Sequence, residues 1–285
     1  MLGQRIVTAI VLLAVLAAAL AAPNPWWFVA LLALGAACAN WEWLRLTLPQ
    51  PPSRAVAVGV PVVLFAVMLG LAHLWLGGAP AGAQIAVALL QWLVPVVALI
   101  WLVCAWTAVY RGRADAPPAS LGWSAFSVLA VLAAWSVLAL WFMARGWVYV
   151  ISLLALVWIA DIAAYFAGRA FGKRKLAPKV SPGKTIAGAV AGVGGAVLWI
   201  VISGQYAGTY AADLFARGGW LLAIPAGAIL GVVSIVGDLF ESLLKRRAGV
   251  KDSSALLPGH GGVYDRIDAI LPVAPIALLL TGVLF

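Results

Sequence analysis

Asp161 is a carboxylate in the middle of an apolar run, residues 157–165. A charge at that depth in an apolar helix is costly, so it needs a cationic partner or a wet cavity. Tyr165 and Arg169 follow at i+4 and i+8, which places all three side chains on one helix face. The spacing predicts either a structural aspartate satisfied by Tyr165 or Arg169, or a carboxylate that faces a functional site.

Two carboxylate pairs follow in the same half of the chain. Asp238 and Glu241 are three residues apart near the end of an apolar segment, and Asp265 and Asp268 repeat that spacing where the next segment starts. Clusters of oxygen ligands suit hard cations, above all Mg²⁺ shared with substrate phosphates. We predict that the four aspartates converge at one membrane depth on the cytoplasmic side: Asp161, Asp238, Asp265 and Asp268. The alternative is that each carboxylate pairs with a nearby Lys or Arg.

A basic segment, residues 168–184, ends in Ser181-Pro-Gly-Lys184-Thr185. Ser at the N-cap and Pro at N1 predict a helix start at Ser181, with free backbone N–H groups and Lys184 as a phosphate cradle. A P-loop is excluded because Pro178 stands where that pattern requires glycine. The alternative is a basic loop that only follows the positive-inside rule.

The last loop, residues 242–268, carries two clusters of cations on either side of a Pro-Gly-His-Gly-Gly turn. Glycines in such a turn allow close backbone approach to a ligand. His260 either orients a phosphate or moves a proton there, or it only stabilises the loop. Upstream, the glycines at 188, 192, 194 and 195 have the small-xxx-small spacing of closely packed helices.

The elements that position these residues are apolar segments. Of 285 residues, 65% are hydrophobic and 9% are charged, which excludes a soluble domain and a disordered chain. The apolar runs are continuous and about 20 residues long, as a membrane helix requires, whereas a membrane β-barrel alternates apolar and polar residues. We therefore predict an all-α, polytopic membrane bundle of about nine spans, at residues 6–22, 25–46, 55–77, 83–109, 121–144, 147–168, 184–204, 220–244 and 267–285.

The formal net charge of +9 fits basic loops beside anionic lipid better than nucleic-acid binding. If successive loops alternate sides, every Lys and Arg except Arg145 and Arg217 falls on one side. The positive-inside rule then predicts a cytoplasmic N-terminus and an external C-terminus. An alternative for the first span is a signal peptide that is removed.

The chain reads as one domain, residues 1–285, without internal repeats. Residues 1–146 form the scaffold spans in this interpretation, and residues 147–285 form the catalytic spans and loops. Seven of the nine acidic residues lie between Asp161 and Asp268, so chemistry is expected in the second part.

The stretch from Ser242 to Asp268 resembles the signature of the phosphatidate cytidylyltransferases, or CDP-diacylglycerol synthases: S-x-x-K-R, then K-D after four residues, then P-x-H-G-G-x-x-D-R-x-D. The matching residues are Ser242, Lys245, Arg246, Lys251, Asp252, Pro258, His260, Gly261, Gly262, Asp265, Arg266 and Asp268. The segments 181–185 and 237–242 are also similar to the family. The N-terminal half is similar only in having several apolar spans.

The resemblance implies the reaction of CTP with phosphatidic acid to CDP-diacylglycerol and pyrophosphate, on the cytoplasmic side of a bacterial inner membrane. It also implies Mg²⁺, a second metal ion such as K⁺, contact with membrane lipids and a homodimer. Asp238 and Asp265 are then the expected metal ligands, with Asp161, Glu241 and Asp268 in or beside the coordination sphere.

The other site residues fall into two expected roles. Catalysis is assigned to Asp265, Asp238, Lys251, His260 and Arg266. Substrate binding is assigned to Ser181, Lys184, Thr185, Lys245, Arg246, Arg169 and Ser242. Two alternatives remain. One is a cytidylyltransferase for another lipid phosphate, such as an isoprenoid-ether lipid. The other is an ion transporter that uses Asp161 and Asp238, although the polar residues gather at one face.

Overall fold

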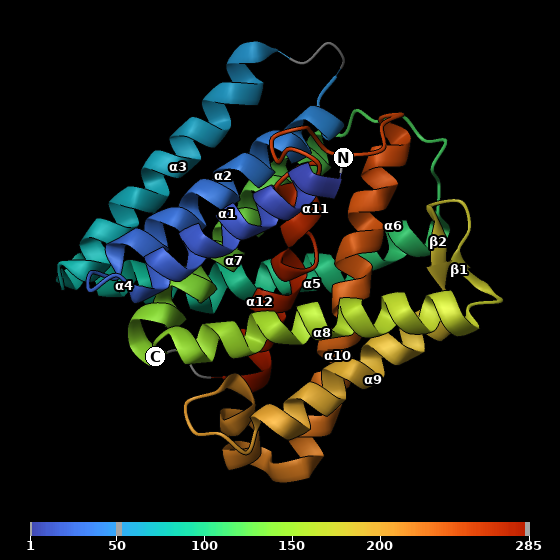
Figure 1. Ribbon diagram of the computed structural model, residues 1–285. Coiled ribbons are helices and arrows are strands. Elements are labelled where there is room, and N and C mark those ends of the chain that lie inside the picture. The colour runs from blue at the N-terminus through green and yellow to red at the C-terminus, as the bar shows by residue number, and fades with distance from the viewer. Residues whose placement is uncertain (1, 50–52, 283–285) are drawn as a thin grey trace.

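The computed structural model describes residues 2–49 and 53–282, and most of them lie in helices (Figure 1). The helices before the basic segment are α1 (Leu2–Ala21), α2 (Trp26–Thr47), α3 (Arg54–Leu76), α4 (Pro80–Ala88), α5 (Val94–Ile100), α6 (Trp106–Arg111), α7 (Leu121–Arg145) and α8 (Trp147–Phe171). After it come α9 (Ile186–Ser203), α10 (Tyr210–Arg247), α11 (Tyr264–Ile267) and α12 (Ile270–Thr281). Two π-helical turns, η1 (Leu89–Leu93) and η2 (Trp101–Ala105), join α4, α5 and α6.

Seven helices within the described ranges are long and apolar enough to cross a membrane. The helix from Pro80 to Arg111 is one of them and runs through both π-helical turns. The prediction of a polytopic helical membrane protein is therefore confirmed. The first predicted span corresponds to a shorter apolar helix, Ile6–Ala21, and the last corresponds to the 12 residues of α12. The count of nine stays a prediction.

The boundary predicted at residue 220 corresponds to a kink inside α10. Gly219 has φ 55° and ψ −147°, which separates the short helical segment that begins at Tyr210 from the long part of this helix that ends at Arg247. Glycine adopts this backbone without the steric cost that a Cβ would bring.

An aromatic cluster lies in the core beneath the last loop. Trp43 of α2 stacks on Tyr264 of α11, with ring centroids 5.0 Å apart. Phe240 of α10 and Trp101 also contact Trp43, at 5.5 and 6.0 Å. All four side chains are essentially fully buried. The cluster joins the N-terminal helices to the segment that carries the family signature.

α8 and α9 lie side by side (Figure 1), and α9 also packs on α10. A Cβ on Gly192 would lie 3.0 Å from the carbonyl oxygen of Ala160, and a Cβ on Gly195 would lie 3.0 Å from the Cβ of Ala163. Gly188 likewise faces α8. Close helix packing is therefore confirmed for these three glycines. It is wrong for Gly194, whose Cβ would meet no described atom within 4 Å.

The predicted helix start at Ser181 is wrong. Strand β1 (Lys175–Ala177) pairs antiparallel with β2 (Ser181–Thr185), and α9 begins only at Ile186. Thr185 is the cap, since its Oγ1 accepts a hydrogen bond of 3.1 Å from the N–H of Gly188. The hairpin turn carries Val180, which is buried against Leu239 and Leu243 of α10. This tertiary contact outweighs the local Ser-Pro capping preference.

Substituting Gly188 tests the α8–α9 packing. A Cβ there would lie 2.8 Å from the carbonyl oxygen of Ala164, so the backbones must separate. We expect Gly188→Ala to lower the free energy of unfolding by about 1–3 kcal/mol. The measurement is the thermal unfolding midpoint of the purified protein, which should fall. Gly194→Ala is the matched control because both changes gain helix propensity. Equal midpoints for the two variants would contradict the close packing.

Candidate functional site

The polar residues of the second half form two neighbouring groups at one end of the bundle. The Asp238 group consists of Asp161 from α8, Lys184 from β2 and Asp238 from α10. The Asp265 group consists of Glu241 and Lys245 from α10 and Asp265 from α11. Each group mixes carboxylates with one lysine, so charge is partly balanced within it.

The Asp238 group surrounds a cavity of about 400 Å³, here called the Asp238 cavity. Lys184 forms an ion pair with Oδ2 of Asp238. Ser242 donates a 3.4 Å hydrogen bond to the other oxygen, Oδ1. Asp161 lines the same cavity, and no direct ion pair of its side chain is found among the described residues. The cavity is therefore lined by two carboxylates. Asp238 is paired with Lys184, and Asp161 has no direct ion pair among the described residues.

The Asp265 group is more enclosed. Lys245 Nζ lies 2.5 Å from Oδ1 of Asp265 and 2.8 Å from Oε2 of Glu241. Oδ2 of Asp265 accepts hydrogen bonds from the N–H of Ser253 at 3.1 Å and from the N–H of Gly262 at 2.7 Å. The hydroxyl oxygen of Ser253 lies 2.8 Å from the same Oδ2. Asp265 thus ties both ends of the last loop to α10.

These contacts decide the ionisation of Asp265. Burial opposes the charged form. The hydrogen bonds with Glu241 and Lys245, the Gly262 N–H and the positive charge of Lys245 outweigh that effect and lower the pKa of Asp265 to about 2. The carboxylate is therefore ionised at neutral pH.

Asp268 lies between the two groups. It interacts electrostatically with Asp238, Asp161 and Lys184, and Glu241 interacts with Asp268 and Asp265. The structure thus brings four of the five predicted metal-site carboxylates into two neighbouring groups, and the fifth, Asp268, interacts with both.

No group of three or more His, Cys, Asp or Glu side chains in the described ranges is close enough to hold a metal ion alone. Mg²⁺ usually takes only one or two protein carboxylates and completes its sphere with water and substrate phosphates. Asp161 and Asp238 face one cavity, and lysine ammonium groups already occupy cation positions beside Asp238 and Asp265. The donor set therefore fits a cation shared with a polyanionic substrate.

The predicted phosphate-binding residues already have partners in the protein. Lys184 and Lys245 are in the ion pairs described above, and Thr185 caps α9. Arg246 Nε donates a 3.2 Å hydrogen bond to the carbonyl of Val180. Arg169 lines the Asp238 cavity, and its Nη1 is 3.4 Å from the Tyr165 hydroxyl, as the i+4 spacing predicts. Ser181 opens β2 and is half-buried.

The glycine turn of the last loop is rigidly held. Arg266 donates two hydrogen bonds, of 3.2 and 2.6 Å, to the carbonyl of His260. Gly261 has φ 84°, and a Cβ there would lie 2.9 Å from Oδ2 of Asp265, so only glycine fits. His260 Nδ1 is buried and has no hydrogen-bond partner among the residues that the structure describes. Lys251 is exposed.

Glu42 is a site residue that the sequence interpretation missed. It lies fully buried in α2. Its Oε2 accepts hydrogen bonds from Ser253 Oγ at 2.9 Å and Tyr264 N–H at 2.6 Å. Its Oε1 accepts from Ser254 Oγ at 2.5 Å and Val263 N–H at 3.0 Å. A single carboxylate from the predicted scaffold region therefore accepts hydrogen bonds from both flanks of the signature loop.

The signal for Glu42 was available in the sequence. Glu42 interrupts an apolar span in the same way as Asp161, and the same argument about buried charge applies to it. The scaffold interpretation of residues 1–146 set it aside, because no neighbour in the sequence indicated a partner more than 200 residues away.

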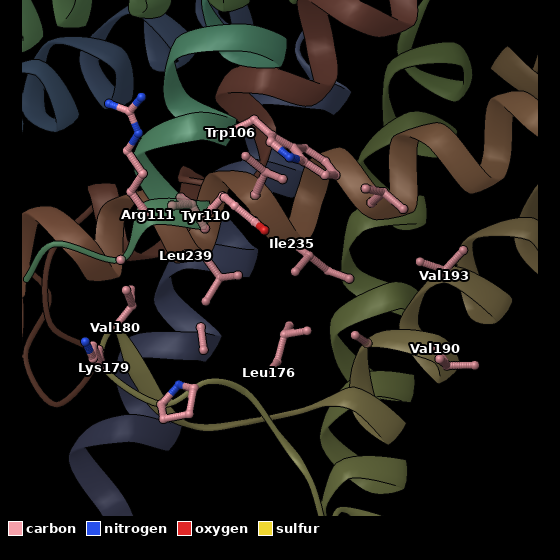
Figure 2. Close-up of a pocket in the computed structure, with 17 residues that line it drawn as sticks. Trp106, Tyr110, Arg111, Leu176, Lys179, Val180, Val190, Val193, Ile235 and Leu239 are labelled. Atoms are coloured by element: carbon pink, nitrogen blue, oxygen red, sulfur yellow. The ribbon is translucent and has the colours of Figure 1, made fainter.

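Figure 2 shows a second, apolar cavity. Its volume is about 850 Å³, and it adjoins the Asp238 cavity. It lies between α6, the β1–β2 hairpin, α9 and α10, and is here called the apolar cavity. Leu176, Ala189 and Ile235 line both cavities. The charged cavity and the apolar cavity therefore meet at these three side chains.

Replacing Glu42 by Gln tests how the loop is held. Each carboxylate oxygen accepts from one fixed backbone N–H, so an amide must turn its NH₂ toward either Val263 or Tyr264. One buried donor is then left unsatisfied, which costs about 1–3 kcal/mol. We expect faster hydrogen exchange of residues 253–264, by about tenfold or more, and a lower thermal midpoint.

Asp115→Asn is the control for Glu42→Gln, since it makes the same chemical change at an exposed carboxylate. If hydrogen exchange of residues 253–264 is unchanged in Glu42→Gln, the hydrogen bonds to Glu42 do not hold this loop.

Comparison with known proteins identifies the family. The model of the cytidylyltransferase family matches residues 3–284. The phosphatidate cytidylyltransferase of Pseudomonas aeruginosa is 38% identical over 282 residues, which cover 97% of this chain and 95% of that protein. The phosphatidate cytidylyltransferase of Haemophilus influenzae is 36% identical over 296 residues and covers 96% of each chain. The resemblance in the last loop is thus confirmed, and the chain belongs to the cytidylyltransferase family.

Proposed function

We propose that this nucleotidyltransferase transfers CMP from CTP to phosphatidic acid in phospholipid synthesis, giving CDP-diacylglycerol and pyrophosphate. The observation that carries the proposal is the Asp238 cavity, where two carboxylates and Lys184 meet at the end of an apolar bundle. The relatives that cover almost the whole chain are named for this activity.

The reaction needs little acid–base chemistry. A phosphate monoester has its second pKa near 6, so the lipid phosphate is largely ionised at neutral pH. Its oxygen attacks the α-phosphorus of CTP, the bond between the α-phosphorus and the bridging oxygen breaks, and pyrophosphate leaves. Both substrates are polyanions, so the enzyme must offset repulsion and align the reacting atoms.

Mg²⁺ fits this site and would neutralise charge that develops on the phosphate oxygens. We propose Asp238 and Asp265 as its ligands, with Asp161, Glu241 and Asp268 nearby. A second cation such as K⁺ belongs to the same proposal. Support comes from the lysines: Lys184 and Lys245 already place positive charge beside Asp238 and Asp265.

The lysines take a second role when substrate is bound. Lys184 and Lys245 release their carboxylates and contact phosphate oxygens, together with Lys251, Arg246 and Arg169. Ser181 and His260 donate hydrogen bonds; the buried Nδ1 of His260, without a partner among described residues, supports this assignment for the histidine. Arg266 holds the turn that carries His260.

Asp238→Asn tests the function and the cation together. We expect turnover of labelled CTP with dioleoyl phosphatidic acid to fall about 10²–10³-fold, because Lys184 and the cation lose their shared anion. EDTA should abolish wild-type turnover, and added Mg²⁺ should restore it. Asp115→Asn, at an exposed carboxylate, should keep full turnover.

Two results would contradict this proposal at different points. Full turnover in Asp238→Asn would contradict the proposal that Asp238 binds the cation. If the wild-type protein makes no CDP-lipid from any of several lipid phosphates, the proposed CMP transfer is contradicted.

We also propose nine spans with the N-terminus and the site on the cytoplasmic side of a bacterial inner membrane, in a homodimer. Thr8 of α1 donates a 2.9 Å hydrogen bond to the carbonyl of Pro258, so the N-terminal part of α1 lies at the face of the signature loop. Tyr210 begins α10, at the end of this helix that is opposite to the signature loop. Its hydroxyl donates a 3.1 Å hydrogen bond to the carbonyl of Ala277 in α12. These contacts support opposite sides for the two termini.

Reporter fusions at the C-terminus test this topology. An external C-terminus should give an active alkaline phosphatase fusion and a dark green fluorescent protein fusion in a bacterial host. A fluorescent C-terminal fusion without phosphatase activity would contradict an odd number of spans with the N-terminus inside. Fusions after Arg111, in the basic loop beside the site, are the control and should behave in the opposite way.

A further inference from the structure

We infer that the apolar cavity binds the acyl chains of the lipid phosphate substrate. This inference rests on the proposed function and adds the place where the membrane-embedded part of the substrate lies.

The lining is aliphatic and aromatic over most of its area. Figure 2 shows Leu176, Ile235 and Leu239 around the hollow, with Val190 and Val193 of α9 on its right side. A volume of about 850 Å³ is within the usual range for ligand cavities, which is about 300–1,000 Å³. Such a surface suits hydrocarbon and does not suit a nucleoside triphosphate, whose phosphates would lose their hydration.

The shared wall links this hydrocarbon site to the reacting groups. Leu176 of the hairpin, Ala189 of α9 and Ile235 of α10 line both cavities. Asp238 is three residues after Ile235 on α10, and Lys184 is five residues before Ala189. A lipid with its phosphate beside Lys184 and Asp238 therefore has its glycerol at this wall and its chains in the apolar cavity.

The cavity opens where lipid would be. Val190 is 68% exposed, and both helices beside it, α9 and α10, are candidate membrane spans. At the loop end the lining changes to Arg111 and Lys179, which Figure 2 shows on the side opposite Val190. Cations suit the anionic headgroup region, and aliphatic residues suit the bilayer interior. The lining of the cavity thus changes from cationic to aliphatic in the same order as an anionic lipid changes from headgroup to acyl chain.

Bulky substitutions at the lining test the inference. Val190 and Val193 line the apolar cavity but do not line the Asp238 cavity. We expect Val190→Trp and Val193→Trp to raise KM about tenfold or more for dioleoyl phosphatidic acid, and to leave kcat/KM for the dihexanoyl lipid and KM for CTP within about twofold. Leu198→Trp is the matched control, because Leu198 is an exposed residue of α9 outside the cavity.

Photolabelling gives a readout that does not need turnover. Phosphatidic acid with a diazirine in one acyl chain should label peptides of α6, α9 and α10 in the wild-type protein. Unlabelled phosphatidic acid should compete, phosphatidylcholine should not, and Val193→Trp should reduce labelling. Labelling that phosphatidylcholine removes equally well would show bulk lipid in the cavity and overturn the inference.

The kinetic outcomes separate this inference from the proposed function. An active wild type whose tryptophan variants keep the same KM for long-chain and short-chain lipids would overturn the acyl-chain site alone. A wild type that is inactive with every lipid phosphate would overturn the proposed function, and the labelling pattern would still decide what the cavity binds.

Discussion

The structure depends on satisfying buried charge at the end of an apolar bundle. Glu42 is fully buried, and it is tolerated because four donors from residues 253–264 reach its two oxygens. The backbone N–H of Ser253 donates to Asp265, which in turn contacts Lys245. A continuous chain of polar contacts therefore runs from α2 through the loop to α10. Removing a member leaves a neighbouring buried donor or charge without its partner, which costs more than the contact itself contributes.

Local features of the sequence predicted the helices well. Continuous apolar runs specified the membrane helices, and small residues at i and i+4 specified the face of α9 that meets α8. The hairpin was not predictable in this way. Ser181 and Pro182 have the local preferences of a helix start, and only the burial of Val180 against Leu239 and Leu243 favours an extended chain. That contact is made across more than fifty residues, where sequence spacing carries no information.

In the candidate site, too, local spacing was predictive and contacts between distant residues were not. Spacing at i+3 and i+4 placed Asp238 with Ser242 and Asp161 with Arg169 on common faces, and the structure brings each pair to one region. Spacing could not indicate which lysine balances which carboxylate, since Lys184 and Asp238 come from different elements. Glu42 was overlooked for the same reason: its donors lie at the far end of the chain.

The two faces of α9 line different cavities, one charged and one apolar. Its glycines at 188 and 192 let the backbone of α8 approach and bring Asp161 toward Asp238 at the cavity that Lys184 closes. Its other face carries Ala189, Val190 and Val193, which line the apolar cavity. A larger residue at 188 would separate the carboxylates, and a larger residue at 193 would fill the space for hydrocarbon. The alternation of glycine with aliphatic residues in this helix thus places the charged cavity beside the apolar one, as the proposed reaction between a water-soluble nucleotide and a lipid requires.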